Sequence, residues 1–278
     1  MPERETLTFD DLRPYLLLQN GNYLYRIPYR GGFAVLKVYY GSRGTLSRLL
    51  KSTENVLLSG QTSYFPQTRR RIELECLEVW SRHGFRVFRT YDVDVIAPDC
   101  PPGGYTVFEY VDRPKLGAFM GDGAVPEDER FELWRRWLGE WGRRHEIAIA
   151  EREPRLVHEN GDGKHVMLLE DGGFLWFDFE MIYRSRAHVD RHVSHEIVQY
   201  LWQITKTCSA IAERLIRETV EAYPSPERLQ AAVDYFFRHP NHLHRVGRAL
   251  DRTFSKRARK STSKYRVAAR IADALGSR

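Results

Sequence analysis

Apolar and aromatic runs in the first third of the chain predict an antiparallel sheet. Residues 15–18, 23–28 and 33–40 are rich in apolar and β-branched side chains, and Gln-Asn-Gly-Asn and Tyr-Arg-Gly-Gly separate them. Strand-length runs between turn-forming residues are typical of hairpins, so we expect a three-stranded meander. Two further strands are expected at residues 86–97 and 105–110.

Apolar residues elsewhere recur at helical spacing. Ile72, Cys76, Val79 and Trp80 repeat in this way between Gln67 and His83, and Gly84 is a typical helix terminator. Further helices are expected at residues 45–51, 127–150, 194–207, 208–222 and 226–238, the third because Ser-His-Glu-Ile resembles a capping box. The order of elements, strands and one long helix first and mostly helices from Pro126 onward, predicts an α+β fold.

The amino-acid composition limits the classes of binding partner expected for this chain. The chain has 278 residues with a formal charge of +6 and a pI near 9.2, which favours anionic partners such as nucleotide phosphates, an acidic membrane surface or nucleic acid. The segment 256–270 is rich in Lys and Arg and lacks acidic residues. Three distant cysteines predict neither a disulfide framework nor a metal knuckle. Without a leader or a membrane-spanning run, we expect a cytoplasmic protein.

The segment from Val157 to Glu180 carries the strongest functional signal. Its apolar runs 166–169 and 174–177 flank Glu-Asp-Gly-Gly, which predicts a hairpin with its turn at Asp171 to Gly173. A hairpin brings its outer ends together, so the polar loop before it and the acid after it are expected to share one small volume. The polar residues concerned are His158, Asn160, Asp162, His165 and Asp178.

Lys37 is a second candidate, because it interrupts the apolar strand Ala-Val-Leu-Lys-Val-Tyr-Tyr. A lysine in an apolar strand is costly unless its ammonium finds an anion; otherwise it lies on the solvent face of an edge strand. Glu73, Glu75 and Glu78 of the following helix are candidate partners. We choose Glu73, which lies three turns before the terminating glycine on a face that can turn toward the sheet.

Protein kinases combine a strand lysine and a helix glutamate with H-R-D-x-x-x-x-N and D-F-G motifs. Here Lys37 and Glu73 precede a hinge-like Phe-Glu-Tyr-Val-Asp, and His158, Asn160, His165 and Asp178 follow at the matching spacing. This order resembles the bacterial lipopolysaccharide-core kinases of the eukaryotic-like kinase superfamily, the Kdo and heptose kinases. The similarity covers about residues 15–205 and includes KVYYGSRGTLSRLL and RRRIELECLEVWSRHG.

The resemblance implies a two-lobed protein-kinase-like fold that uses ATP and magnesium, with a sheet lobe at 1–108, a hinge at 109–113 and a helical lobe at 114–278. Lys37 and Glu73 would orient the phosphates, and Asp178 would hold the metal with His165 assisting. Three residues would complete the nucleotide site: Gly21, the single glycine of the phosphate-covering loop, and Glu109 and Val111, whose backbone would meet the adenine.

Asn160 departs from the family, which has there the aspartate that accepts the proton of the sugar hydroxyl. General-base assistance is worth about a hundredfold to ten-thousandfold, so Asn160 implies a slow enzyme, a replacement base or no transfer. Asp162 and Glu159 are close enough in sequence to replace it; Asp162, between Gly161 and Gly163, is preferred, with an Asx-turn as its structural alternative. Glu180 replaces the last glycine of D-F-G and either adds a carboxylate near the metal or faces solvent.

Two functions are therefore expected. The first is an ATP- and magnesium-dependent phosphotransferase acting on a hydroxyl of an envelope glycolipid, with peripheral contact to the inner face of the membrane. The second is a pseudokinase that binds nucleotide or a partner with little phosphoryl transfer. Nucleic-acid binding through 256–270 has the least support, because no groove-reading motif accompanies the charge.

Overall fold

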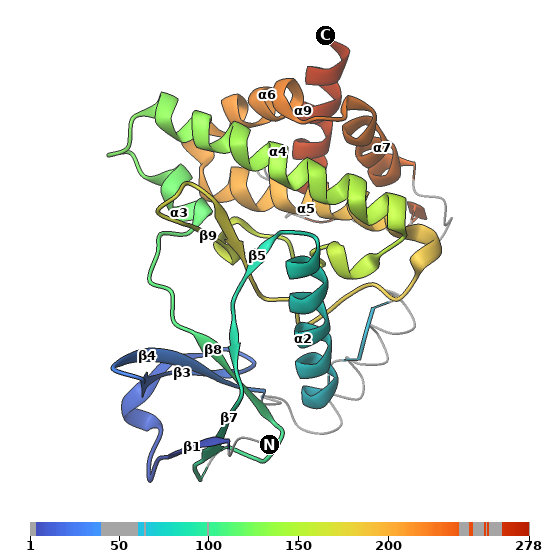
Figure 1. The fold of residues 1–278 in the computed structure, drawn as a ribbon. Coiled ribbons are helices and arrows are strands. Elements are labelled where there is room, and N and C mark those ends of the chain that lie inside the picture. The colour runs from blue at the N-terminus through green and yellow to red at the C-terminus, as the bar shows by residue number, and fades with distance from the viewer. Residues whose placement is uncertain are drawn as a thin grey trace. The chain divides into compact units, whose positions relative to one another are not determined.

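The computed structural model describes residues 4–39, 61–63, 65–98, 100–238, 245, 246, 253, 255 and 263–277. The chain divides into two compact units. The sheet unit comprises Met1–Arg113 together with Trp176–Arg184, and the helical unit comprises Pro114–Leu175 together with Ser185–Arg278. Each unit is described separately below, and Figure 1 labels their elements.

Five antiparallel strands form the main sheet of the sheet unit, in the order β2-β3-β4-β8-β6. Their bounds are Leu16–Gln19 for β2, Tyr23–Tyr29 for β3, Gly32–Val38 for β4, Tyr105–Glu109 for β8 and Thr90–Tyr91 for β6. A second, parallel pair joins β1 (Glu5–Thr8) to β7 (Val93–Ile96). The predicted meander is therefore present as β2, β3 and β4. The single strand predicted at 86–97 is instead divided into β5 (Arg86–Val87), β6 and β7.

One face of this sheet builds the core of the unit. Ala34, Leu36 and Val38 alternate along β4 and are buried in a cluster with Ile27 of β3 and Val107 of β8. Successive strand residues point to opposite faces, so the side chain of the intervening Lys37 leaves the sheet on the face opposite this cluster.

Helix α2 (Pro66–Arg82) belongs to the sheet unit and begins with proline at its first position, where the missing N–H costs nothing. It ends at Arg82 and is followed, after the cap residue His83, by Gly84, whose φ of 76° is a conformation that glycine adopts without strain. Trp80 is fully buried and packs against Phe85, Trp176 and Phe179. The indole therefore anchors the later segment 176–184 to the helix.

The helical unit is built around α4 (Glu127–Glu151) and α5 (Val189–Thr207), which contact each other. Figure 1 shows α6 (Ala212–Ala222), α7 (Pro226–Phe237) and α9 (Lys264–Gly276) in the same unit, which also contains α3 (Leu116–Gly121). Trp134, Trp137 and Trp141 stack along α4 with ring centroids 4.6 Å apart and are fully buried. The hairpin of β9 (Val166–Leu168) and β10 (Phe174–Trp176) was predicted and is present.

The predicted α+β class, with a small antiparallel sheet and a helical part, is confirmed. Three local predictions are wrong. The helix expected from Ser194 begins at Val189, and Ser194 lies inside it with its hydroxyl donating to the carbonyl of Asp190. The helix expected from residue 208 begins at Ala212. Residues 176–184 group with the sheet unit rather than with the rest of 114–278, because aromatic side chains of this segment pack on Trp80.

Some elements escaped the sequence pattern. Neither β1, α3 nor α9 was predicted, and α9 occupies part of the basic segment 256–270. The helix expected at 45–51 lies outside the described residues. Across the part of the chain that the structure describes, no helix combines the length and apolar character needed to cross a bilayer.

Candidate functional site

Lys37 is held in the sheet by β4, where it pairs in register with Leu24 of β3 and Thr106 of β8. It is 7% exposed, so its ammonium is removed from water and needs anionic partners. A central strand position of this kind excludes the alternative that Lys37 lies on the solvent face of an edge strand.

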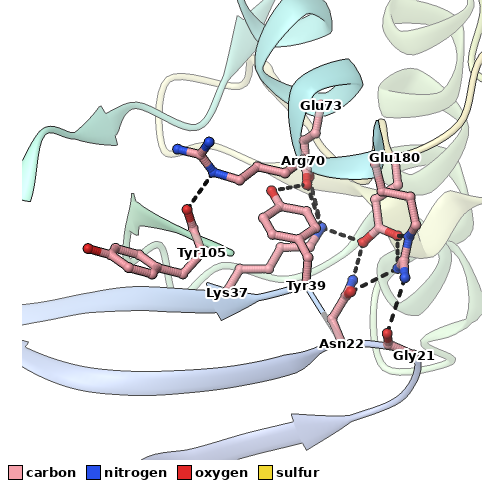
Figure 2. Close-up of polar contacts among 9 residues, drawn as sticks. Gly21, Asn22, Lys37, Tyr39, Arg70, Glu73, Tyr105 and Glu180 are labelled. Atoms are coloured by element: carbon pink, nitrogen blue, oxygen red, sulfur yellow. Dashed lines mark hydrogen bonds and ion pairs between the residues drawn. The ribbon is translucent and has the colours of Figure 1, made fainter. Parts of the chain in front are cut away.

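Glu73 of α2 is the first partner of Lys37. The ammonium Nζ lies 2.9 Å from Oε1 and 2.7 Å from Oε2 of Glu73, and the carboxylate is also buried. The hydroxyl of Tyr39 donates to Oε2 at 2.6 Å. The pairing of Lys37 with Glu73 rather than with Glu75 or Glu78 is thus present, and Figure 2 shows it.

Glu180 is the second partner of Lys37. Its Oε1 lies 2.6 Å from Nζ, so one ammonium contacts two carboxylates (Figure 2). The Glu180 side chain is 12% exposed, which excludes the solvent-facing alternative. Phe179, the preceding residue, packs on Trp80 with ring centroids 4.5 Å apart, and this contact positions Glu180 next to Lys37.

Arg69 brings a second cation to the same carboxylate. Its guanidinium donates to Oε2 of Glu180, with Nε at 2.8 Å, and its Nη2 contacts the same oxygen. The same side chain donates to the carbonyl of Gly21 at 3.2 Å and to Oδ1 of Asn22 at 2.8 Å. The Asn22 amide in turn donates to Oε1 of Glu180, as Figure 2 shows. Arg69 therefore joins α2 to the turn between β2 and β3.

The pKa of Lys37 follows from these contacts. Burial by itself would lower the pKa of the ammonium, but the carboxylates of Glu180 and Glu73 outweigh burial and raise the pKa well above its ordinary value. Burial raises the pKa of Glu73, and the nearby Glu180 acts in the same direction while Lys37 opposes both. Lys37 is therefore a fixed cation at any physiological pH.

Asp178 lies in the same unit and also acts electrostatically on Lys37, raising the pKa of the lysine. Its backbone has a φ of 73°, in the left-handed region that non-glycine residues adopt only at a cost of about 1 kcal/mol or more. Conformations of this kind cluster at functional sites because the surrounding structure has to impose them. The sheet unit thus contains the Lys37–Glu73 pair and an aspartate, Asp178, that acts on the same lysine, while their joint role in holding a nucleotide stays a prediction.

These residues fit a metal–nucleotide complex better than a metal alone. Among the described residues there is no group of three or more His, Cys, Asp or Glu that could hold a metal ion. Magnesium is typically bound by one or two carboxylates together with substrate phosphates, so Asp178 would supply the protein ligand and phosphate oxygens the rest. Lys37 offers the matching cation.

The loop before the hairpin belongs to the helical unit. Nδ1 of His165 donates to the carbonyl of Asn160 at 3.1 Å, so the ring keeps its proton on that nitrogen. The Asn160 side chain is exposed. Oδ1 of Asp162 accepts from the backbone N–H of Lys164 at 3.0 Å, the Asx-type contact considered as its structural alternative. The catalytic and metal-binding roles assigned to these three residues stay predictions.

A buried polar cluster supports that loop from within the helical unit. Glu196 of α5 is fully buried and accepts hydrogen bonds from Arg144, from the indole of Trp141 at 2.9 Å and from the backbone N–H of His158 at 2.8 Å. Burial by itself would raise the pKa of Glu196, but Arg144 and His145 outweigh it and hold the pKa at about 2. A permanent anion thus fixes the start of the loop.

The remaining predicted nucleotide residues have clear structural places. Gly21 turns the chain between β2 and β3 with a φ of 74°, which explains why glycine occurs there. Glu109 ends β8 and accepts from the backbone N–H of Arg89 at 2.9 Å. Val111 lies in the irregular segment after β8. Their contacts to adenine or phosphate stay predictions.

Two residues of the site, Arg69 and Asn22, were not predicted from the sequence. Arg69 precedes Glu73 by four residues, and residues four apart share a helix face, so directing Glu73 at the sheet also directs Arg69 there. That spacing was a usable signal. Asn22 carried none, because its role depends on a residue 158 positions later in the chain.

Comparisons with known proteins identify no family for this chain: no family model and no curated protein matches it. Among solved structures, the Rio2 kinase–ADP/Mg²⁺–phosphoaspartate complex of Chaetomium thermophilum is 12% identical, with 95% of this chain and 70% of that chain covered at a TM-score of 0.40. An apo pseudokinase is 14% identical, with 98% and 97% covered at a TM-score of 0.41. A kinase and a pseudokinase are thus among its structural neighbours, but at these scores neither bears on its activity.

Proposed function

We propose that the sheet unit binds a nucleoside triphosphate with magnesium and that the protein is a kinase-like phosphotransferase. The observation that carries this proposal is the buried Lys37 paired with Glu73 beside Asp178. A buried ammonium of raised pKa is a permanent cation in a site of low dielectric, where its attraction for phosphate is strong.

Each residue has a distinct role in this proposal. Glu73 orients the ammonium of Lys37, which would hold phosphate oxygens in line for transfer. Asp178 would hold magnesium, which when bound neutralises the charge on the transferring phosphoryl group. Asn160 or Asp162 would meet the acceptor hydroxyl, and His165 would assist at the metal, although magnesium prefers oxygen ligands.

The binding half of the proposal is tested by calorimetric titration of ATP with and without magnesium. Lys37→Met is expected to weaken binding at least about tenfold, because the loss of a charged partner of phosphate costs about 1.4 kcal/mol or more. Lys206→Met, at an exposed position of α5, is the matched control and should bind as the wild type does. Asp178→Asn should remove the gain in affinity that magnesium provides. Equal affinities across all four proteins would refute the proposal.

For the acceptor we propose a hydroxyl of an envelope glycolipid such as a lipopolysaccharide core sugar. The resemblance described above suggests this class, and the charge of +6 is compatible with an anionic head group and with peripheral contact to a membrane. Incubation with radiolabelled ATP and a panel of core-sugar acceptors should label one of them. Cosedimentation with anionic and neutral vesicles tests the membrane contact separately.

The second candidate function is that of a pseudokinase, and two observations favour it. Asn160 stands where the residue that accepts the proton is expected, and the carboxylate of Glu180 already pairs with the ammonium of Lys37. Nucleotide binding without measurable transfer in the wild type would support this candidate. Asn160→Asp then separates the causes, because restoring the base should raise turnover by about a hundredfold or more only if the rest of the site is competent.

A further inference from the structure

Four buried charged groups contact one another within the described part of the sheet unit. Two cations, Lys37 and Arg69, face two carboxylates, Glu73 and Glu180, and their formal charges cancel. All four side chains are 12% exposed or less. A triphosphate that entered beside these groups would add several negative charges where two carboxylates already balance the two cations and Asp178 acts as a further anion, which low dielectric makes costly.

The ammonium of Lys37 has three protons to donate. Three carboxylate oxygens lie within 2.9 Å of it: both oxygens of Glu73 and Oε1 of Glu180. A phosphate oxygen can therefore bond to Lys37 only if at least one of these carboxylate oxygens gives up its contact.

Glu180 is the carboxylate that is able to withdraw. Glu73 lies on α2, receives a further hydrogen bond from Tyr39, and has a side chain only 5% exposed. Glu180 lies outside any helix or strand, follows the strained backbone at Asp178, and is more exposed. Releasing Glu180 would also free the guanidinium of Arg69 from that carboxylate.

We infer that the Glu180 carboxylate fills the position of a nucleotide phosphate between Lys37 and Arg69, and that nucleotide binding must displace it. The surroundings of Glu180 suit a phosphate group, since an ammonium, a guanidinium and the amide of Asn22 all donate to it. Arg69 then becomes a second phosphate-binding residue. This inference rests on the proposed nucleotide-binding function.

The direct test removes the negative charge and keeps the shape. Glu180→Gln is expected to bind MgATP, and tripolyphosphate without nucleotide, about tenfold or more tightly than the wild type by calorimetry. Glu78→Gln is the matched control, because it makes the same charge change at a side chain that is 72% exposed and should leave both affinities unchanged. Thermal unfolding of each variant verifies that it is folded.

A second measurement needs no substitution. If MgATP displaces Glu180, hydrogen exchange of the backbone amides at 178–183 in the wild type should become faster on binding. Slower exchange there would overturn the inference. Equal or weaker binding of MgATP by Glu180→Gln than by the wild type would also overturn the inference. If the wild type itself binds MgATP in that case, the proposed nucleotide-binding function still stands. Failure of both proteins to bind either probe would overturn both.

Discussion

Replacing Lys37 with methionine is expected to destabilise the protein by about 3 to 5 kcal/mol, the cost of breaking a buried ion pair by removing one partner. Methionine fills a similar volume, so packing changes little and the effect is electrostatic. The structure sets the magnitude: the Lys37 and Glu73 side chains are 9% and 5% exposed, so water cannot replace the lost ammonium. Glu73 and Glu180 would then face each other as buried like charges.

The pH dependence has a defined sign. Burial already raises the pKa of Glu73, and loss of Lys37 removes the group that opposes this rise. A carboxyl whose folded-state pKa lies above its unfolded value gives stability that is lost as pH rises through the folded pKa. The deficit of Lys37→Met relative to wild type should therefore be larger at pH 8 than at pH 5.

Urea unfolding measured at both pH values is the assay. The double variant Lys37→Met with Glu73→Gln removes one charge of each sign, so Glu180 keeps Arg69 as its partner. It should regain most of the lost free energy, which gives a coupling of about 2 kcal/mol or more in a double-mutant cycle. A loss below about 1 kcal/mol for Lys37→Met, or a double variant no more stable than the single one, would refute the buried pair.

Three further outcomes are expected in the helical unit. Glu196→Gln should lower the free energy of unfolding by about 3 kcal/mol, because Arg144 stays buried without its anion; a loss under 1 kcal/mol in urea would contradict this. Burial lowers the pKa of His192 to about 4, so its share of stability is lost as pH falls from about 6.5 to 4, and His192→Gln should flatten that slope in a pH series of unfolding curves. Gly161→Ala would drive its Cβ into the Tyr200 ring and should cost about 1 to 3 kcal/mol in thermal unfolding; an unchanged melting temperature would count against the close contact.

Much of the candidate site could be predicted because its signals are local. A lysine inside an apolar strand and a glutamate on the sheet-facing side of the next helix define a pair through two short-range periodicities. The Asp171 to Gly173 turn likewise defines a hairpin, since turn chemistry acts over a few residues. Helix boundaries were less predictable. Ser194 has the sequence of a helix start, but burial of Val189 and Val193 extends α5 toward the N-terminus, so that it begins at Val189.

Sequence alone indicated a sheet strand that carries a lysine, a following helix with candidate glutamate partners, and an aspartate behind a buried strand. Tertiary structure alone decided which groups surround that lysine. Arg69 and Glu180 are 111 positions apart, and Asn22 and Glu180 are 158 apart. No local pattern encodes such contacts, because they depend on how the Phe179 ring packs on Trp80 and so where Glu180 is placed.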